Sequence, residues 1–250
     1  MSQFPTNPIE FSEETGVRYL HFGSDWVQGA MRVRRPFALE LEYTRQMAAG
    51  LLLRPEPWPR RVLMIGLGAG SLAKFFHRHV PQCRITVVEI DPRVVHMARA
   101  HFRLPEEDAR LSIVIGDGAE YITRRSGHWD AILVDGFDHK ASAGDLATEP
   151  FYAACRAALT PRGLASFNLF GQRRGYKAQL QRLMTSFDGR ILALPMCESG
   201  NIIAFAHGGE DVSLASSTLH EREKALRAAT GLDLRETVAR LDVMGTGICF

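Results

Sequence analysis

Two carboxylates that follow one apolar segment could take part in acid–base chemistry. Asp135 comes directly after the apolar run 131–134, and Asp138 lies three residues further along the chain. A carboxylate in such a position can attract a cationic substrate and can accept a proton from it during the reaction. The same residue types also cap turns or remain in solvent, so their neighbours in the fold must decide between these roles.

A glycine-rich loop indicates a second kind of chemistry, the binding of a nucleoside. Gly66, Gly68 and Gly70 follow the apolar run 62–65 and precede a predicted helix. Glycines let a ligand come close to the backbone, and the start of a helix provides free N–H groups. Glu89 ends the next predicted strand, where a carboxylate can accept hydrogen bonds from both hydroxyls of a ribose.

A third element, Asp117 with Gly118, ends the following predicted strand, where the edge of an adenine would be read. A dinucleotide explains the pattern less well, because Ser71 matches the G-x-G-x-x-G fingerprint only in part and Asp117 would have no role. An adenosyl ligand accounts for all three elements. The opposing interpretation is that the glycines only allow close packing and that Glu89 is a surface acid.

The elements that must position these residues alternate between strands and helices. Apolar strands are predicted at 62–65, 84–88, 111–115, 131–134 and 165–169. Helices are predicted at 71–79, 92–102, 119–125, 150–159 and 176–187. Continuous apolar strands separated by helices predict an α/β protein with a parallel sheet covered on both faces. Two further strands, 191–196 and 201–206, are joined too tightly for a crossover helix and should be antiparallel.

Two flanking regions complete the predicted organisation. Residues 1–55 should contain a small β-hairpin (17–22 and 26–31) and a helix (37–53), which prolines separate from a nucleoside-binding domain at 56–208. Residues 209–250 form a polar tail with helices at 220–230 and 234–241. This tail fits packing or an oligomer contact better than chemistry.

Composition excludes several classes of protein. The 250 residues are 46% hydrophobic and 23% charged, which is typical of a globular chain, and the formal net charge of +2 is too small to favour nucleic acid as a partner. No apolar run reaches the roughly 18 residues of a membrane span, and the N-terminus does not resemble a signal peptide. The cysteines form no C-x-x-C and the histidines no ligand pair, so we expect free thiols in the cytoplasm and no metal.

At the level of motifs, the sequence resembles the spermidine synthase (polyamine aminopropyltransferase) family, within the S-adenosylmethionine methyltransferase-like fold. The motifs that carry the resemblance occur in the family's order: 26–31, 41–44, the glycine loop, V-E-I-D at 88–91, G-D-G at 116–118, D-x-x-D at 135–138 and the tail segment 231–235. The resemblance implies a Rossmann-like class I methyltransferase fold, with a mostly parallel seven-stranded sheet whose last strand is antiparallel.

The resemblance also implies a reaction and a role for each residue. An aminopropyl group would pass from decarboxylated S-adenosylmethionine to a small amine such as putrescine, with Asp135 as the general base and the protein as a homodimer. The nucleoside would be held by Gly66, Gly68, Gly70, Glu89, Asp117 and Gly118. The acceptor amine would be held by Gln28, Tyr43 and Asp138.

The glycine loop departs from the family pattern at the donor's reactive end. The family's loop contains an acid, thought to hold the amine of the donor, and Ala69 occupies that position here. Classical methyltransferases have an acid earlier in the loop, where this chain has Met64. The donor is therefore either decarboxylated or ordinary S-adenosylmethionine. A methyltransferase with an unidentified acceptor and a catalytically idle nucleoside-binding protein remain alternatives.

Overall fold

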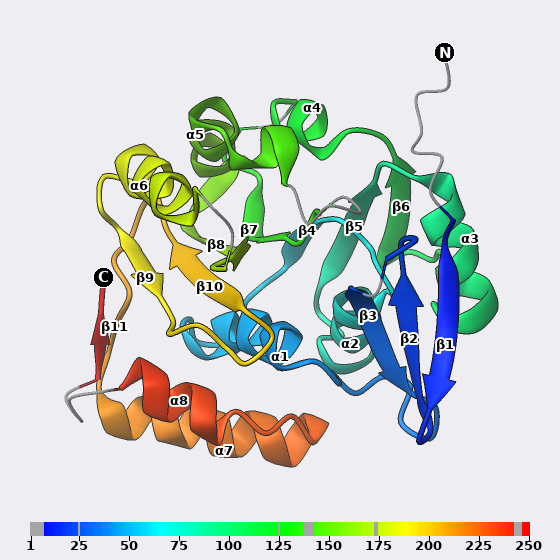
Figure 1. The fold of residues 1–250 in the computed structure, drawn as a ribbon. Helices are drawn as coiled ribbons and strands as arrows, with labels where there is room; N and C mark the ends of the chain where they lie inside the picture. The colour runs from blue at the N-terminus through cyan, green and yellow to red at the C-terminus, as the bar shows by residue number, and fades with distance from the viewer. Residues whose placement is uncertain (1–7, 25, 125, 138–142, 173–174, 243–246) are drawn as a thin grey trace.

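The computed structural model describes residues 8–24, 26–124, 126–137, 143–172, 175–242 and 247–250. A seven-stranded sheet forms the centre of the molecule, in the order β6-β5-β4-β7-β8-β10-β9 (Figure 1). Its strands are β4 (Arg61–Ile65), β5 (Arg84–Glu89), β6 (Leu111–Ile115), β7 (Trp129–Val134), β8 (Leu159–Phe170), β9 (Ile191–Ala193) and β10 (Asn201–Ala206). Strands β4 to β8 pair in parallel, whereas β10 is antiparallel to both neighbours. The predicted mostly parallel sheet with an antiparallel last strand is confirmed.

Two strand boundaries differ from the prediction. Strand β8 begins at Leu159 rather than at 165, because Leu159 and Leu164 pair with β7 although the residues between them are not apolar. Strand β9 ends at Ala193 rather than at 196, and only the Leu194 N–H continues the pairing, at 2.8 Å from the Ile203 carbonyl oxygen.

Helices cover both faces of the sheet. One face carries α1 (Glu42–Ala48), α2 (Ser71–His79) and α3 (Pro92–His101), and the other carries α4 (Gly118–Ile122), α5 (Glu149–Ala158) and α6 (Tyr176–Ser186) (Figure 1). Successive strand side chains point to opposite faces, so β4 contributes Val62 and Met64 to one apolar core and Leu63 and Ile65 to the other. This double burial explains why β4 has a continuous apolar sequence.

A separate antiparallel sheet precedes the central one and consists of β1 (Glu10–Glu14), β2 (Val17–His21) and β3 (Val27–Arg32). The predicted hairpin is present as β2 and β3. Strand β1 was not predicted, because all five of its residues are exposed and show no apolar pattern. The predicted helix 37–53 is shorter: α1 starts at Glu42 after turns at Arg35 and Ala38, and a 3-10 turn at Ala49–Leu52 follows it.

The C-terminal tail forms α7 (Ser216–Thr230), α8 (Arg235–Leu241) and the short pair β11 (Ser213–Leu214) and β12 (Ile248–Cys249). Leu219, Leu234 and Val238 are buried in the core that also contains α1 and α2. The two predicted tail helices are therefore confirmed as packed elements, and they lie beside α1 (Figure 1). The division of the chain at residues 55 and 208 stays a prediction.

Candidate active site

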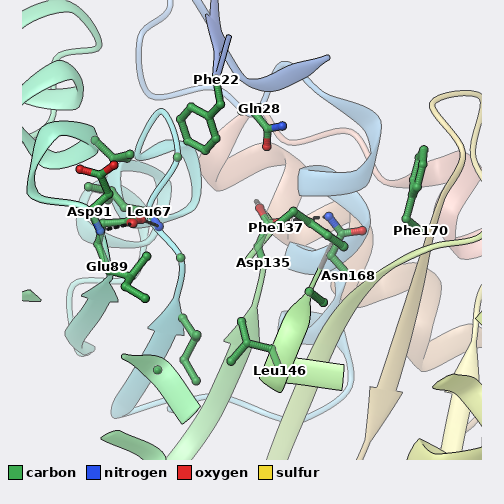
Figure 2. Close-up of a pocket in the computed structure, with 18 of the residues that line it drawn as sticks. Phe22, Gln28, Leu67, Glu89, Asp91, Asp135, Phe137, Leu146, Asn168 and Phe170 are labelled. Carbon is green, nitrogen blue, oxygen red and sulfur yellow. Dashed lines mark hydrogen bonds between the residues drawn. The ribbon is translucent and has the colours of Figure 1, made fainter. Parts of the chain in front are cut away.

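A cavity of about 630 Å³ lies at the carboxyl ends of β4, β5 and β7. The strand order reverses between β4 and β7, and open α/β sheets bind ligands at such a point. The N-terminal sheet and the turn before β3 cover it, so that Phe22 and Gln28 lie over the strand ends (Figure 2). The predicted site residues that line the cavity are Gln28, Tyr43, Gly66, Gly68, Glu89, Asp117, Gly118 and Asp135. Gly70 does not line it, and Asp138 lies outside the described residues.

The glycine loop joins two strand ends in tight contact. Gly66 has a φ of +93°, and a Cβ at this position would lie 2.2 Å from the carbonyl oxygen of Asp135. Gly70 has a φ of +68° and a position close to Leu104, and it precedes the first turn of α2. Only glycine adopts these backbone conformations without strain. Gly66 and Gly70 thus allow close packing, and Gly66 and Gly68 also border the cavity.

Glu89 is buried, with 7% of its surface exposed, so it is not a surface acid. One carboxylate oxygen accepts a hydrogen bond from the Leu67 N–H at 2.9 Å, and the other accepts one from the Asp91 N–H at 3.0 Å (Figure 2). Burial raises the pKa of Glu89, although these backbone bonds stabilise its charge. Each oxygen retains a further lone pair with which it could accept a ribose hydroxyl.

Asp117 and Gly118 form the start of α4. One carboxylate oxygen of Asp117 accepts a hydrogen bond from the Ala119 N–H at 2.7 Å and caps the helix. A Cβ on Gly118 would lie 2.3 Å from Cγ2 of Ile65, so only glycine allows α4 to begin this close to β4. The second oxygen of Asp117 is the one that could read an adenine edge.

Asp135 follows β7 and is held by two side chains from distant parts of the chain. The Asn168 amide donates a hydrogen bond to it at 2.7 Å (Figure 2), and the Tyr43 hydroxyl is a second donor. Burial raises the pKa of Asp135, and the two hydrogen bonds oppose the increase. The pKa of Tyr43 is raised well above 10 by burial and by the neighbouring Asp135 charge, so its hydroxyl stays protonated and keeps donating.

Asn168 was missed by the sequence analysis. It is a polar residue within a predicted strand whose only other polar residue is Ser166, and it is 5% exposed. An amide costs free energy when it is buried without partners. This interruption of the apolar run was the available signal.

Aromatic side chains cover the Asp135 end of the cavity and were also not predicted. Trp26, in the turn before β3, packs edge-on against Phe170 at the end of β8, with ring centroids 5.0 Å apart. Phe22, Phe137 and Leu146 line the same cavity (Figure 2). They give the cavity an apolar lining beside its carboxylates, and electrostatic interactions are stronger where water is excluded.

The charge lining the cavity is strongly acidic. Its carboxylates are Glu42, Glu89, Asp91, Asp117, Asp135, Asp145 and Glu198, and the one cationic side chain among the described lining residues is Arg93. Arg93 forms an ion pair with Asp91 at 2.6 Å. A chain with a net charge of +2 has therefore concentrated negative charge in one cavity, which favours a cationic ligand.

Among the residues that the structure describes, no group of three or more His, Cys, Asp or Glu side chains is arranged to hold a metal ion. None of the helices described has the length and apolar character needed to cross a membrane.

Comparison with known proteins assigns the family. The spermine/spermidine synthase domain matches residues 40–169, about half of the chain. A polyamine aminopropyltransferase of Chromobacterium violaceum is 38% identical over 93% of this chain and 88% of its own length. The chain belongs to the spermine/spermidine synthase family. The resemblance seen in the motifs is thereby confirmed.

Two solved structures extend the comparison. A spermidine synthase in complex with the transition-state analogue AdoDATO has a TM-score of 0.61 and 26% identity, over 80% of this chain and 74% of its own. Human methyltransferase-like protein 13 in complex with SAH has a TM-score of 0.67 and 27% identity, over 76% of this chain and 93% of its own. These similarities confirm the class I methyltransferase fold.

Ala69, at the loop position where the family resemblance implies an acid, is buried against the N-terminal sheet. It is 2% exposed and packs with Leu20, Met31 and Phe102 in a small core. A Cβ on Gly29 would lie 2.6 Å from the Cβ of Ala69, so β3 lies directly against the loop.

Proposed function

We propose that this protein transfers an aminopropyl group from decarboxylated S-adenosylmethionine to a di- or polyamine such as putrescine. The observation that carries the proposal is the acidic cavity with half-buried Asp135 at the end of β7. Both substrates are cations, one a sulfonium and the other an ammonium, and a cavity rich in carboxylates attracts both. Family membership supports the same reaction.

The nucleoside part of the donor would lie against the ends of β4, β5 and β6. Glu89 would accept the ribose hydroxyls, and Asp117 with Gly118 would contact the adenine. Ile90 is 49% exposed and lines the cavity, so it offers an apolar surface to a flat base. Gly66 and Gly68 allow the sulfonium region to approach the backbone closely.

The acceptor would lie between Asp135, Tyr43 and Gln28, with Asp138 as a further proposed contact. A primary amine has a reference pKa of about 10 and is protonated at neutral pH, so it must lose a proton before it can react. Asp135 both attracts the ammonium and accepts a proton. Burial raises the pKa of Asp135 above its usual value, which makes it a stronger base than an ordinary aspartate.

Two bonds between heavy atoms change in the reaction. The acceptor amine first gives one proton to Asp135, and its nitrogen then attacks the methylene carbon beside the sulfonium, so that the C–N bond forms and the C–S bond breaks. The electron pair of the broken bond goes to sulfur, and methylthioadenosine leaves as a neutral thioether. The new secondary ammonium keeps its protons, as an amine with a pKa of about 10 does at neutral pH. Holding nitrogen, carbon and sulfur in line supplies much of the acceleration.

A product assay tests this function. Purified protein incubated with putrescine and decarboxylated donor should release methylthioadenosine, detected by chromatography. The Asp233→Asn variant is a suitable control for charge removal, since Asp233 is paired with Arg235 in an exposed turn outside the cavity. Release of S-adenosylhomocysteine from ordinary S-adenosylmethionine, with no methylthioadenosine from the decarboxylated donor, would contradict the proposal.

Methyl transfer from ordinary S-adenosylmethionine is the second candidate function, and one observation favours it. Buried Ala69 occupies the loop position where the family resemblance implies an acid that would hold the amine of a decarboxylated donor. Calorimetric titration with the two donors side by side separates the candidates, because the tighter-binding donor identifies the tail that the cavity accepts. Binding of either donor without turnover of any amine would favour an idle nucleoside-binding protein. We further expect a cytoplasmic homodimer, which sedimentation and cell fractionation can test.

A further inference from the structure

A line of hydrogen-bonded side chains reaches Asp135 from the connection between β9 and β10. Cys197 Sγ lies 3.0 Å from the Ser199 hydroxyl, which donates to Oδ1 of Asn201 at 2.7 Å. Asn201 Nδ2 donates to Oδ1 of Asn168 at 2.9 Å, and Asn168 Nδ2 donates to Oδ1 of Asp135 at 2.7 Å. The line crosses the adjacent strands β10, β8 and β7.

The hydrogen bonds of this line all point in one direction. Ser199 donates to the carbonyl oxygen of Asn201, so the NH2 group of Asn201 faces Asn168. Asn168 in turn directs its own NH2 group toward Asp135. A hydrogen bond to an ionised carboxylate is stronger than one to a neutral carboxyl group. The line therefore stabilises the charged form of Asp135 more than the neutral form, and aligned hydrogen bonds of this kind polarise one another.

Asn168 is a polar residue between two core residues of β8. The neighbours Phe167 and Leu169 are each 1% exposed and belong to the apolar core. In the β8–β10 register Asn168 is opposite Ile203, which makes Asn201 its diagonal neighbour, close enough for long side chains to meet. The two asparagines satisfy each other across the sheet, and the remaining NH2 group is free for Asp135.

We propose that Asn168, held by Asn201, is a positioning residue that fixes Oδ1 of Asp135 and so orients this carboxylate toward the attacking amine. The inference rests on the proposed function, since it takes Asp135 as the base. It goes beyond that function by assigning a task to a pair of residues on β8 and β10. Ser199 fixes the orientation of this pair.

The test compares Asn168→Ala, Asn201→Ala and the double variant with wild type. Loss of the Asn168 hydrogen bond removes a donor that stabilises the charged carboxylate, so the acidic limb of the kcat/KM profile should move up by about one pH unit. At neutral pH, kcat/KM should fall about 10- to 100-fold, while the Kd for the nucleoside changes less than about twofold. Asn201→Ala should shift the limb in the same direction by a smaller amount.

The double variant decides whether the two residues act as one unit. If Asn201 acts through Asn168, its substitution should have no further effect in the Asn168→Ala background. Ser166→Ala is the matched control, because Ser166 is buried on the same face of β8 two residues away and does not line the cavity. Its pH profile should match wild type. An unmoved acidic limb in Asn168→Ala, or additive effects of the two substitutions, would overturn the inference.

A titration that does not depend on turnover keeps this inference separate from the proposed function. In protein labelled with ¹³C at the aspartate carboxyl groups, the Asp135 signal, assigned with Asp135→Asn, should titrate at higher pH in Asn168→Ala than in wild type. If Asp135→Asn retains full activity while the titration shifts as expected, the base assignment is wrong but the positioning contact is real. If Asp135→Asn is inactive and the titration does not shift, the positioning role fails and the base assignment stands.

Thermal unfolding of each variant identifies any that fails to fold. If Asn168→Ala does not fold, Asn201→Ala, at the start of β10, still supplies the test.

Discussion

The two halves of the cavity are held by different kinds of contact. In the half proposed to bind the nucleoside (the nucleoside half), formed by the glycine loop, Glu89 and Asp117, carboxylates accept hydrogen bonds from nearby backbone N–H groups. In the half proposed to bind the amine (the amine half), Asp135 is held by the side chains of Tyr43 and Asn168, which come from distant parts of the sequence. Backbone contacts fix the binding surface as part of the fold, whereas side-chain contacts can adjust the charge and position of one reactive group.

Removing the charge of Asp135 should have the largest effect and should fall on one half alone. We expect Asp135→Asn to lower kcat by about 10²- to 10⁴-fold, because a general base contributes to the chemical step. The amide retains an oxygen that can accept from Asn168, so the Kd for the nucleoside should stay within about tenfold. Steady-state kinetics and calorimetry measure the two quantities. A collapse of binding with an unchanged rate would show that the two halves are not separate.

A side chain inserted into the nucleoside half should disrupt the fold rather than add a function. Ala69→Asp would place a carboxylate against Gly29 in a small core whose other buried side chains are apolar. An unpaired buried charge of this kind should lower the free energy of unfolding by about 2–4 kcal/mol. Urea unfolding checks the value. Ala69→Ser is the control, since it adds a small neutral group, and a variant Ala69→Asp as stable as wild type would show that the loop can rearrange to hold an acid.

The contrast between the halves also explains how far the sequence could be interpreted. The motifs of the nucleoside half are local, since Gly66, Glu89 and Asp117 each end a strand with a clear apolar pattern, and the cavity lies where those ends predicted it. Strand β1 escaped prediction because its five residues are all exposed and carry no apolar periodicity. The helix at 37–53 was predicted too long because turns interrupt the segment before Glu42.

Less of the amine half was visible in the sequence. Asp135 follows an apolar strand and could be proposed from its position, while the role of Tyr43 came from the family resemblance alone. Asn168 lies 33 residues from Asp135, and the two meet only because β7 and β8 are neighbours in the sheet. Sequence spacing carries no signal for a contact between side chains of adjacent strands. The pairing of Trp26 with Phe170 is hidden for the same reason.

Glu89→Ala should have the opposite signature to Asp135→Asn, with a smaller size. Glu89 holds the backbone at Leu67 and Asp91 and is the proposed ribose contact, so its loss should raise the Kd for the nucleoside about 10- to 100-fold. The rate at saturating donor should change much less. Glu89→Gln keeps one oxygen that can accept, so its Kd should lie between those of wild type and Glu89→Ala. Equal losses of kcat in both variants would contradict a role confined to binding.

The smallest expected effect is a change in the free energy of unfolding with pH, and it comes from a residue outside both halves. This change would overlap with the pH dependence of kcat/KM that we attribute to Asp135. Lys74 in α2 is 1% exposed, donates to the Phe102 carbonyl oxygen at 2.7 Å, and has its pKa lowered by burial from 10.5 to about 7. Between these two pKa values the unfolded chain binds more protons than the folded one. The free energy of unfolding should therefore rise with pH in this window, by about 1–2 kcal/mol from pH 7 to 9.

Lys74→Met removes this dependence and separates stability from catalysis. The variant keeps the length of the side chain without its charge, so its free energy of unfolding should be nearly constant between pH 7 and 9, as measured by urea unfolding at each pH. Lys224→Met, at an exposed position of α7, is the matched control and should leave the wild-type slope intact. If the kcat/KM profile of Lys74→Met keeps its acidic limb, that limb belongs to the amine half. If the variant loses both the acidic limb and the pH dependence of its free energy of unfolding, the limb reflects unfolding. The kinetics would then give no support for Asp135 as the base.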